Sequence, residues 1–328
     1  MLLNFRLMLR LPGNHIVFAF SDPAGANACI GMSELSAAVY LQSSTLISNR
    51  TYHGSFNKDV QLVGSITSFK KLKADCLFTG TSHPASSAYF EVNCIKQAKE
   101  EGIKTISFVD HWINFRLRFL DEEMQVVYPD EIWLVDDRAK ELAVEECLPP
   151  DKLEISGNPY HEFLKKLWKP KFYGKSYLEQ LQIPTGGLTV LFAPDPLSLR
   201  NGEERAGFTE AGALRLLIDT ISRLYIPIRI IIKYHPLQPV EAFAGFLEQK
   251  LPNIHFVQAA DTLELLQACD IIIGFYSNIL LEAEAINKKT IRFFPGNTEA
   301  DLLRHKSSLP LARDEDELLA ILKHCINE

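Results

Sequence analysis

Two short stretches in the second half of the chain combine residues that can bind phosphate. In the first, an apolar run ends in Lys233 and His235, and Pro236 follows directly. Because proline restricts the preceding residue to an extended backbone, the His235 imidazole should be held at the end of a strand. A lysine and a fixed imidazole suit a phosphate oxygen, and His235 would be catalytic if it neutralised a departing phosphate. A structural role for Lys233, His235 and Pro236 is the alternative.

The second stretch follows an apolar run that ends in glycine at position 274. Ser277 and Asn278 are residue types that begin helices, and the first backbone N–H groups of a helix can bind phosphate. Glu282 lies one turn into the predicted helix, where its carboxylate could accept hydrogen bonds from ribose hydroxyls. Asp195, after the first strand of this half, could also contact a phosphate. An ordinary capped turn and a flexible loop are the alternatives.

Acid–base and aromatic side chains gather in the first half, after a predicted strand at 105–109. Asp110 and His111 come first, and Trp112 and Arg116 follow. Ligands of open parallel sheets bind beyond the carboxyl ends of the strands. Asp110 or His111 could therefore be the base that deprotonates an acceptor hydroxyl, with Trp112 and Arg116 on the acceptor side. A helix-capping aspartate beside a surface aromatic is the alternative interpretation.

A loop of small residues after the first predicted strand, at 15–20, contains Asp22, Gly25 and Asn27. Small residues let the backbone approach a ligand, and a helix begins here. The loop lacks the G-x-G-x-x-G pattern and a suitably spaced acidic residue, so we do not expect NAD binding. We expect either a tight turn or an acceptor-side loop.

The elements that must position these residues alternate between strands and helices. Apolar runs at 15–20, 44–48, 76–79, 105–109 and 131–135 are separated by helical stretches, and the second half repeats the pattern from 188 onward. This alternation predicts parallel sheets. A polar stretch rich in proline, glycine and lysine interrupts it. We predict an α/β protein with two Rossmann-like domains whose parallel sheets face a central cleft: an acceptor-side domain at 1–165, a linker at 166–187 and a nucleotide-donor domain at 188–328.

The composition narrows the class of protein. The chain of 328 residues has a net charge of −7, which argues against a general attraction to nucleic acid. Its six cysteines form no C-x-x-C pair and fit no zinc pattern, as in a reducing compartment. No apolar stretch approaches the ~20 residues that span a bilayer. We expect a cytoplasmic protein that needs no divalent metal, with weak peripheral membrane contact through its apolar N-terminus as an option.

The second half, at 188–325, resembles the donor half of the GT-B glycosyltransferase superfamily. The matching motifs are K-x-H-P at 233–236 and D-I-I-I-G-x-x-S-N-x-x-x-E-A at 270–283. They are similar to motifs of bacterial sialyl- and Kdo-transferases that use CMP-sugars, of CDP-glycerol transferases and of UDP-GlcNAc 2-epimerases. The resemblance implies that His235 and Ser277 contact the donor phosphate and that Glu282 binds the ribose. It implies no cofactor beyond a nucleotide-activated sugar or alditol, possibly CMP- or CDP-linked.

Two departures from these families bear on the function. Ser277-Asn278 and Glu282-Ala283 replace the Ser-Gly-Gly turn and the Glu-Glu pair of the epimerases, and the acidic base motif of the sialyltransferases is missing from the first half. Our main hypothesis is a glycosyltransferase or alditol-phosphate transferase that acts on a hydroxyl of a glycan or glycoconjugate in surface polysaccharide synthesis. The alternatives are a sugar-nucleotide epimerase or hydrolase and a non-catalytic nucleotide-binding subunit.

Overall fold

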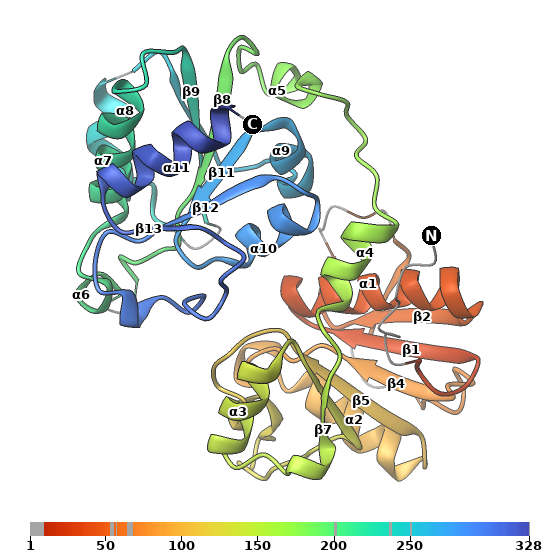
Figure 1. Ribbon diagram of the computed structural model, residues 1–328. Helices are drawn as coiled ribbons and strands as arrows, with labels where there is room; N and C mark the ends of the chain where they lie inside the picture. Colours follow the sequence, from red (N-terminus) through yellow and green to blue (C-terminus); the bar gives the residue numbers. More distant parts are fainter. Residues whose placement is uncertain are drawn as a thin grey trace. The chain divides into compact units, whose positions relative to one another are not determined.

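The chain divides into two α/β units, at Met1–Trp168 (unit 1) and Lys169–Glu328 (unit 2) (Figure 1). The computed structural model describes residues 10–52, 56, 58–63, 68–199, 202–235, 238–249 and 251–327. Each unit is built on a sheet in which every pair of neighbouring strands is parallel, so the predicted α/β class with two Rossmann-like domains is confirmed.

Unit 1 is built on a seven-stranded sheet, counted over its described residues, in the order β3-β2-β1-β4-β5-β6-β7. The strands are β1 (His15–Phe20), β2 (Ser43–Ser48), β3 (Val60–Leu62), β4 (Cys76–Thr79), β5 (Lys104–Val109), β6 (Glu131–Leu134) and β7 (Leu153–Ile155). The helices are α1 (Pro23–Tyr40), α2 (Phe90–Glu100), α3 (Asp137–Glu145) and α4 (Pro159–Lys166), with 3-10 turns η1 (Ala85–Ser87), η2 (Arg116–Phe119) and η3 (Pro150–Lys152). The sequence pattern missed β3, a strand of three residues.

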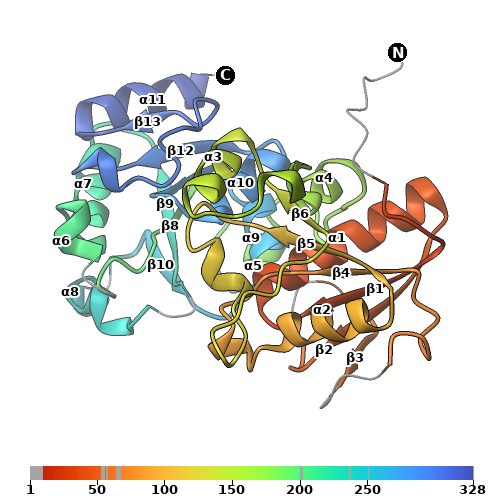
Figure 2. The ribbon, with the colours of Figure 1, turned by 90° about the horizontal axis from the view of Figure 1, so that it is seen from below.

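Helices cover both faces of the unit 1 sheet, as Figure 2 shows for α1 and α2. Successive residues of a strand point to opposite faces. Phe18 and Phe20 of β1 accordingly pack in one apolar cluster with residues of α1, whereas Val17 and Ala19 pack in another with residues of α2. Because both faces are buried, β1 is apolar from Ile16 to Phe20 rather than alternating.

Unit 2 is built on a six-stranded sheet, again counted over described residues, in the order β10-β9-β8-β11-β12-β13. The strands are β8 (Leu188–Ala193), β9 (Ile228–Lys233), β10 (Ile254–Val257), β11 (Ile271–Gly274), β12 (Lys289–Phe293) and β13 (Leu311–Ala312). The helices are α5 (Ser176–Gln180), α6 (Gly202–Ala206), α7 (Glu210–Ser222), α8 (Ala244–Gln249), α9 (Thr262–Ala268), α10 (Asn278–Ala285) and α11 (Glu315–Asn327), with η4 (Val240–Phe243) and η5 (Thr298–Ala300). None of the helices in the described parts of the chain is long and apolar enough to cross a bilayer.

The stretch predicted as a linker, 166–187, contains structure of its own. Helix α5 lies within this stretch, and unit 2 already begins in it, at Lys169. The Lys175 ammonium is 2.7 Å from a carboxylate oxygen of Asp270 and 2.7 Å from the carbonyl oxygen of Gly187. These contacts tie α5 to the amino-terminal edge of the unit 2 sheet. Lys175 therefore anchors this stretch to unit 2, which composition alone does not reveal.

Candidate functional site

Each unit has one place where the order of its strands reverses. In unit 1 it lies between β1 and β4, and in unit 2 between β8 and β11. The chain runs to opposite sides from such a pair of strands, which leaves a crevice at their carboxyl ends where ligands of open α/β sheets bind. The candidate residues predicted for the acceptor side belong to unit 1, and those predicted for the nucleotide donor belong to unit 2. The two places are described in turn.

In unit 2, Asp195 links the two loops at the reversal. Its carboxylate follows β8, accepts a hydrogen bond of 3.0 Å from the backbone N–H of Tyr276 after β11, and interacts with the N–H of Ser277. The residue is 7% exposed, and burial raises its pKa to about 7. Asp195 therefore holds the loop that precedes α10. Its contact with a phosphate remains a prediction.

Ser277 and Asn278 begin α10, as predicted. Ser277 has the extended backbone of an N-cap, but in the described part of unit 2 its hydroxyl makes no capping hydrogen bond. The hydroxyl and the first N–H groups of the helix can therefore turn to a ligand, and the positive end of the helix dipole favours an anion there. This geometry suits one phosphate group.

Lys233 at the end of β9 lies in the electrostatic field of two carboxylates, Glu282 on α10 and Asp261 before α9. Burial lowers the pKa of Lys233, and the two carboxylates oppose that shift. Burial raises the pKa of Glu282 to about 7, and Lys233 opposes the rise. The two half-buried groups interact without a direct ion pair between these described residues. A ligand hydroxyl or phosphate placed between them would meet both charges.

His235 follows Lys233 at the same edge of the sheet. Burial and the neighbouring Lys233 charge both lower the pKa of its imidazole, so it is neutral near pH 7. A neutral imidazole can still donate one N–H to a phosphate oxygen. Pro236 lies outside the described residues. Asp261 was missed by the sequence analysis because it follows β10, a short strand with no obvious motif.

In unit 1, the reversal brings two carboxylates and an arginine together. Asp22 caps α1 by accepting a hydrogen bond of 2.7 Å from the Gly25 N–H. Asp110, after β5, lies 3.3 Å from a guanidinium nitrogen of Arg118, which also bonds to Thr81 after β4. Burial raises the pKa of Asp22, as does the Asp110 charge, while Arg118 lowers it. The loops after β1 and β5 thus place their charged side chains in one group, and Thr81 of the β4 loop joins it.

His111 belongs to this group through its electrostatic coupling to Asp110. Burial lowers the pKa of the imidazole and Asp110 opposes the shift. The Nδ1 atom accepts a hydrogen bond of 3.0 Å from the Trp112 N–H, so Nε2 carries the proton in the neutral form. The predicted pair Asp110 and His111 therefore lies at the crevice edge, together with Asp22 and Arg118.

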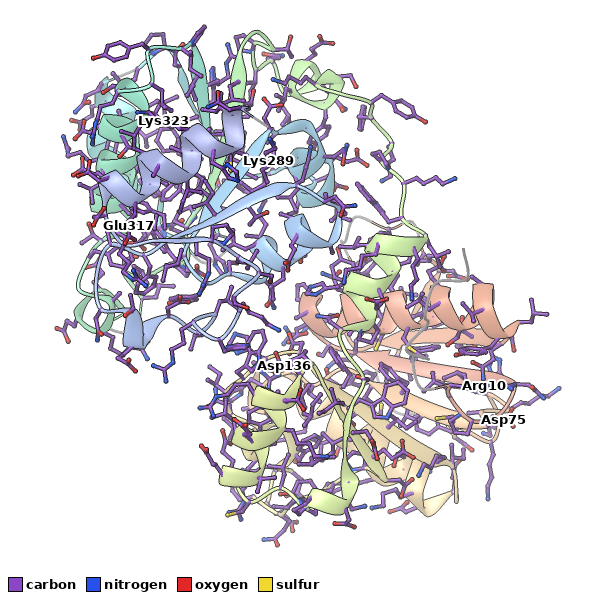
Figure 3. The ribbon with its side chains drawn as sticks, viewed as in Figure 1. Arg10, Asp75, Asp136, Lys289, Glu317 and Lys323 are labelled. Carbon is purple, nitrogen blue, oxygen red and sulfur yellow. The ribbon has the colours of Figure 1, made fainter. Side chains whose placement is uncertain are left out.

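The two residues predicted on the acceptor side, Trp112 and Arg116, differ in exposure, and their role toward an acceptor stays a prediction. Trp112 is 5% exposed, and its Nε1 donates a 2.9 Å hydrogen bond to Asp136, which caps α3 and is labelled in Figure 3. Trp112 thus anchors the loop to α3 and is no surface aromatic. Arg116 is exposed, while Arg118 contacts Asp110, because the tight turn of η2 places residues two apart on different sides. The sequence showed both arginines but not which one faces inward.

Gly25 lies against the loop after β4, and its role toward an acceptor stays a prediction. A Cβ atom added at Gly80, after β4, would lie 2.5 Å from the Gly25 Cα. A side chain at position 80 would therefore push the loops after β1 and β4 apart. This contact fixes the position of Asp22 relative to the β4 loop.

A pocket of about 260 Å³ opens beside this group, at the carboxyl ends of β1 and β2. Asp22 and Asn27, both predicted from the sequence, contribute to its wall. The sequence analysis missed Arg50 and Tyr52, which follow β2. The remaining lining residues are Phe20, Ser21, Pro23, Ala26, Ser48 and Thr51. Among the described residues, no group of three or more His, Cys, Asp or Glu could hold a metal ion.

Comparison with known proteins identifies the fold. No family model and no curated protein matches the chain. Among solved structures, a putative UDP-N-acetylglucosamine 2-epimerase from Listeria monocytogenes is similar with a TM-score of 0.63 at 12% identity, covering 96% of this chain and 88% of that one. The UDP-GlcNAc 2-epimerase of Methanocaldococcus jannaschii gives a TM-score of 0.61 at 13% identity, with 96% and 93% covered.

A third similar structure is Anabaena HepE in complex with UDP-glucose, with a TM-score of 0.57 at 14% identity, covering 95% of this chain and 89% of that one. Identities this low establish the fold alone. The predicted resemblance to CMP-sugar and CDP-glycerol transferases is not shown by these structures, and it remains a prediction. The chain has the two-domain, GT-B-like α/β fold that is found in UDP-GlcNAc 2-epimerases.

Proposed function

We propose that the protein is an enzyme that acts on a UDP-sugar and needs no acceptor, as a sugar-nucleotide epimerase or hydrolase does. The observation that carries the proposal is that the two strand-order reversals gather different kinds of side chain. In unit 2 the reversal gathers Lys233, His235 and the start of α10, which suit the diphosphate group of a nucleoside diphosphate. In unit 1 it gathers Asp22, Asp110 and other groups that can exchange protons.

The ligand class rests on unit 2. Its cation, neutral imidazole and helix start provide donors for phosphate oxygens, and Glu282 provides an acceptor for ribose hydroxyls. Similar structures bind the same class: one was solved with UDP-GlcNAc and UDP, and Anabaena HepE with UDP-glucose. This support favours uridine over the cytidine donor expected from the sequence.

The reaction class rests on unit 1. Elimination of the diphosphate removes a proton from a carbon of the sugar, and hydrolysis removes a proton from the attacking water, so both reactions need a group that accepts a proton. A carboxyl group can accept such a proton and, once protonated, return it. Asp22 is such a group, and it forms part of the pocket wall.

Transfer to an acceptor hydroxyl is the second candidate. Ser277-Asn278 and Glu282-Ala283 stand where the epimerases have a Ser-Gly-Gly turn and a Glu-Glu pair, which favours a transferase over an epimerase. In that case Asp110 or Asp22 would deprotonate the acceptor hydroxyl, and the acceptor would be a glycan or glycoconjugate.

One experiment separates the candidates. The protein is incubated with UDP-GlcNAc, UDP-glucose, a CMP-sugar and CDP-glycerol, with and without oligosaccharide acceptors, and products are followed by proton NMR. Free UDP or an epimerised sugar without acceptor supports the main proposal. Nucleotide release only with acceptor supports the transferase. Binding of UDP with no turnover under any condition contradicts both and leaves the nucleotide-binding subunit.

A further inference from the structure

A buried carboxylate in unit 2 joins two loops at the carboxyl edge of the sheet. Glu210, at the start of α7, is 1% exposed. One of its oxygens accepts hydrogen bonds from the N–H (2.9 Å) and the hydroxyl (3.0 Å) of Ser198, in the loop after β8. The same oxygen accepts a hydrogen bond of 3.4 Å from the side-chain amide of Gln238, in the loop after β9. A buried carboxylate costs stability unless hydrogen bonds compensate it, and here the donors come from these two loops.

Glu210 is not the residue that caps its own helix. The N-cap of α7 is Thr209, whose hydroxyl accepts a hydrogen bond of 2.9 Å from the Gly212 N–H. The helix start therefore has its capping group without Glu210. The hydrogen bonds of the Glu210 carboxylate serve the connection between α7 and the two loops instead.

Gln238 carries this connection to His235. The Gln238 side chain is buried, and its amide oxygen accepts a hydrogen bond of 3.4 Å from the His235 N–H. The Gln238 N–H in turn donates a 2.9 Å hydrogen bond to the His235 carbonyl oxygen. A carboxylate can only accept and a backbone N–H can only donate, so the amide nitrogen must face Glu210 and the amide oxygen must face His235. Both side-chain contacts thus require the same orientation of one amide.

The connection continues across the sheet on the other side of Glu210. Ser198 shares its loop with Asp195, which accepts the 3.0 Å hydrogen bond from the Tyr276 N–H, directly before Ser277 at the start of α10. The strands β9, β8 and β11 are neighbours in the sheet. Hydrogen bonds and one short loop therefore link the two places that suit phosphate, His235 and the start of α10.

We propose that Glu210 and Gln238 are positioning residues, which hold the His235 imidazole where it can donate a hydrogen bond to a phosphate oxygen of the UDP-sugar. This inference rests on the proposed function and extends it by naming two residues that act through His235. A donor that is fixed before the ligand arrives binds more tightly, because less conformational freedom is lost on binding. Neither Glu210 nor Gln238 needs to touch the ligand for this effect.

The positioning is tested first without any ligand. Histidines are labelled with nitrogen-15 in the full-length protein, His235→Gln identifies the His235 signal, and exchange of its backbone N–H with deuterated water is followed by NMR. Gln238→Met, which keeps the length of the side chain, should speed the exchange because the acceptor of this N–H is gone. Glu210→Ala should also speed it, because Gln238 loses the partner that orients its amide. Glu210→Gln, which keeps an acceptor oxygen, should restore most of the protection. If Glu210→Ala does not fold, Gln238→Met still decides.

Asp130 in unit 1 provides the matched control. Its carboxylate accepts hydrogen bonds from the N–H (2.8 Å) and the hydroxyl (3.0 Å) of Thr105, the same pair of donors that Ser198 presents to Glu210. Thr105 and Asp130 lie at the amino-terminal ends of β5 and β6, at the edge of the sheet opposite to the ligand crevice. Asp130→Ala should lower stability in urea denaturation but change neither the exchange of the His235 N–H nor the affinity for UDP.

Calorimetry with UDP provides the second arm. Gln238→Met should weaken UDP binding by about 10-fold, within the range for residues that share one hydrogen-bond network. In a protein that already carries His235→Ala, the same substitution should have almost no further effect, because Gln238 acts through the imidazole that is missing. Affinity for uridine, which has no phosphate, should stay nearly constant in Gln238→Met.

The two proposals fail separately. Unchanged exchange of the His235 N–H in Gln238→Met and Glu210→Ala contradicts the positioning, whatever the protein binds. Gln238→Met losses in UDP affinity that are equal with and without the imidazole, or equal for UDP and uridine, contradict it as well. Faster exchange at His235 in a protein that binds no UDP supports the link between Glu210, Gln238 and His235 and contradicts the proposed function.

Discussion

Units 1 and 2 place an aspartate at the same point of the same topology and use it differently. Asp22 follows β1 and Asp195 follows β8, and each of these strands lies beside the reversal of its own sheet. Asp22 caps its own helix and reaches a pocket. Asp195 is buried and bonds to the backbone of the neighbouring loop. The Asp22 carboxylate thus remains accessible from the pocket, whereas the Asp195 carboxylate fixes the loop that precedes α10.

The length of the following loop explains the difference. In unit 1, Pro23 begins α1 directly after Asp22, so the carboxylate meets the first N–H groups of its own helix. In unit 2, the next long helix, α7, begins only at Glu210, so no such groups lie near Asp195. Its carboxylate turns to Tyr276 and Ser277 instead. Equivalent positions in a sheet therefore do not imply equivalent roles.

We expect the largest effect from a substitution of Asp22, and we expect it on turnover. Asp22→Asn keeps the helix cap but removes the proton-exchanging group, and it should lower turnover by about 10²–10⁴-fold while leaving UDP affinity nearly intact. Asp151→Asn, at an exposed aspartate of unit 1, is the matched control. Turnover of Asp22→Asn within a few-fold of the unmodified enzyme would show that Asp22 is only a cap.

Asp195 should instead determine how stability depends on pH. Its pKa is raised in the folded protein from 3.8 to about 7, so the folded state binds the proton more tightly than the unfolded chain. Its contribution to stability is fully present below pH ~4 and is lost as pH rises through ~7, a change of roughly 4 kcal/mol. Asp195→Asn should therefore flatten the fall in stability between these pH values, as measured by urea denaturation. Parallel curves for both proteins would contradict this assignment.

Lys233 tests whether unit 2 binds the diphosphate. Lys233→Met removes the cation but keeps much of the apolar stem, and it should weaken UDP binding by about 10–150-fold, equivalent to one charge-assisted hydrogen bond. Calorimetry with UDP measures the loss. Lys323→Met, at an exposed lysine of α11 labelled in Figure 3, should bind UDP normally. Equal affinity for Lys233→Met would place the diphosphate elsewhere.

The sequence predicted most of the fold, because apolar runs of both sheets are buried on two faces and are visible without partners. It missed the strands β3 and β13, which have three and two residues and carry no pattern of their own. It also expected a linker where α5 packs, since lysine and glycine content does not distinguish an anchored segment from a free one.

The sequence predicted some of the residues of the candidate site and missed others. Strand ends directed attention to Asp22, Asp110 and His111, which the structure brings to one crevice. Arg118 was missed because a 3-10 turn, not a strand or helix period, decides that it faces inward.

The smallest expected effect concerns a glycine that each unit needs at its reversal. A Cβ atom at Gly80 would lie 2.5 Å from the Gly25 Cα, and one at Gly274, which ends β11, would lie 2.7 Å from the carbonyl oxygen of Ala193. Since backbone atoms cannot move aside as a flexible side chain can, Gly80→Ala and Gly274→Ala should each destabilise by about 1–3 kcal/mol. Gly245→Ala, inside α8 with no atom within 4 Å of the added Cβ, should be neutral or stabilise by about 0.5–1 kcal/mol. Urea denaturation of the three variants gives the comparison. If Gly80→Ala destabilises and Gly274→Ala does not, close approach at the reversal is a requirement of the unit 1 loops alone, and the parallel between the two units ends at their topology.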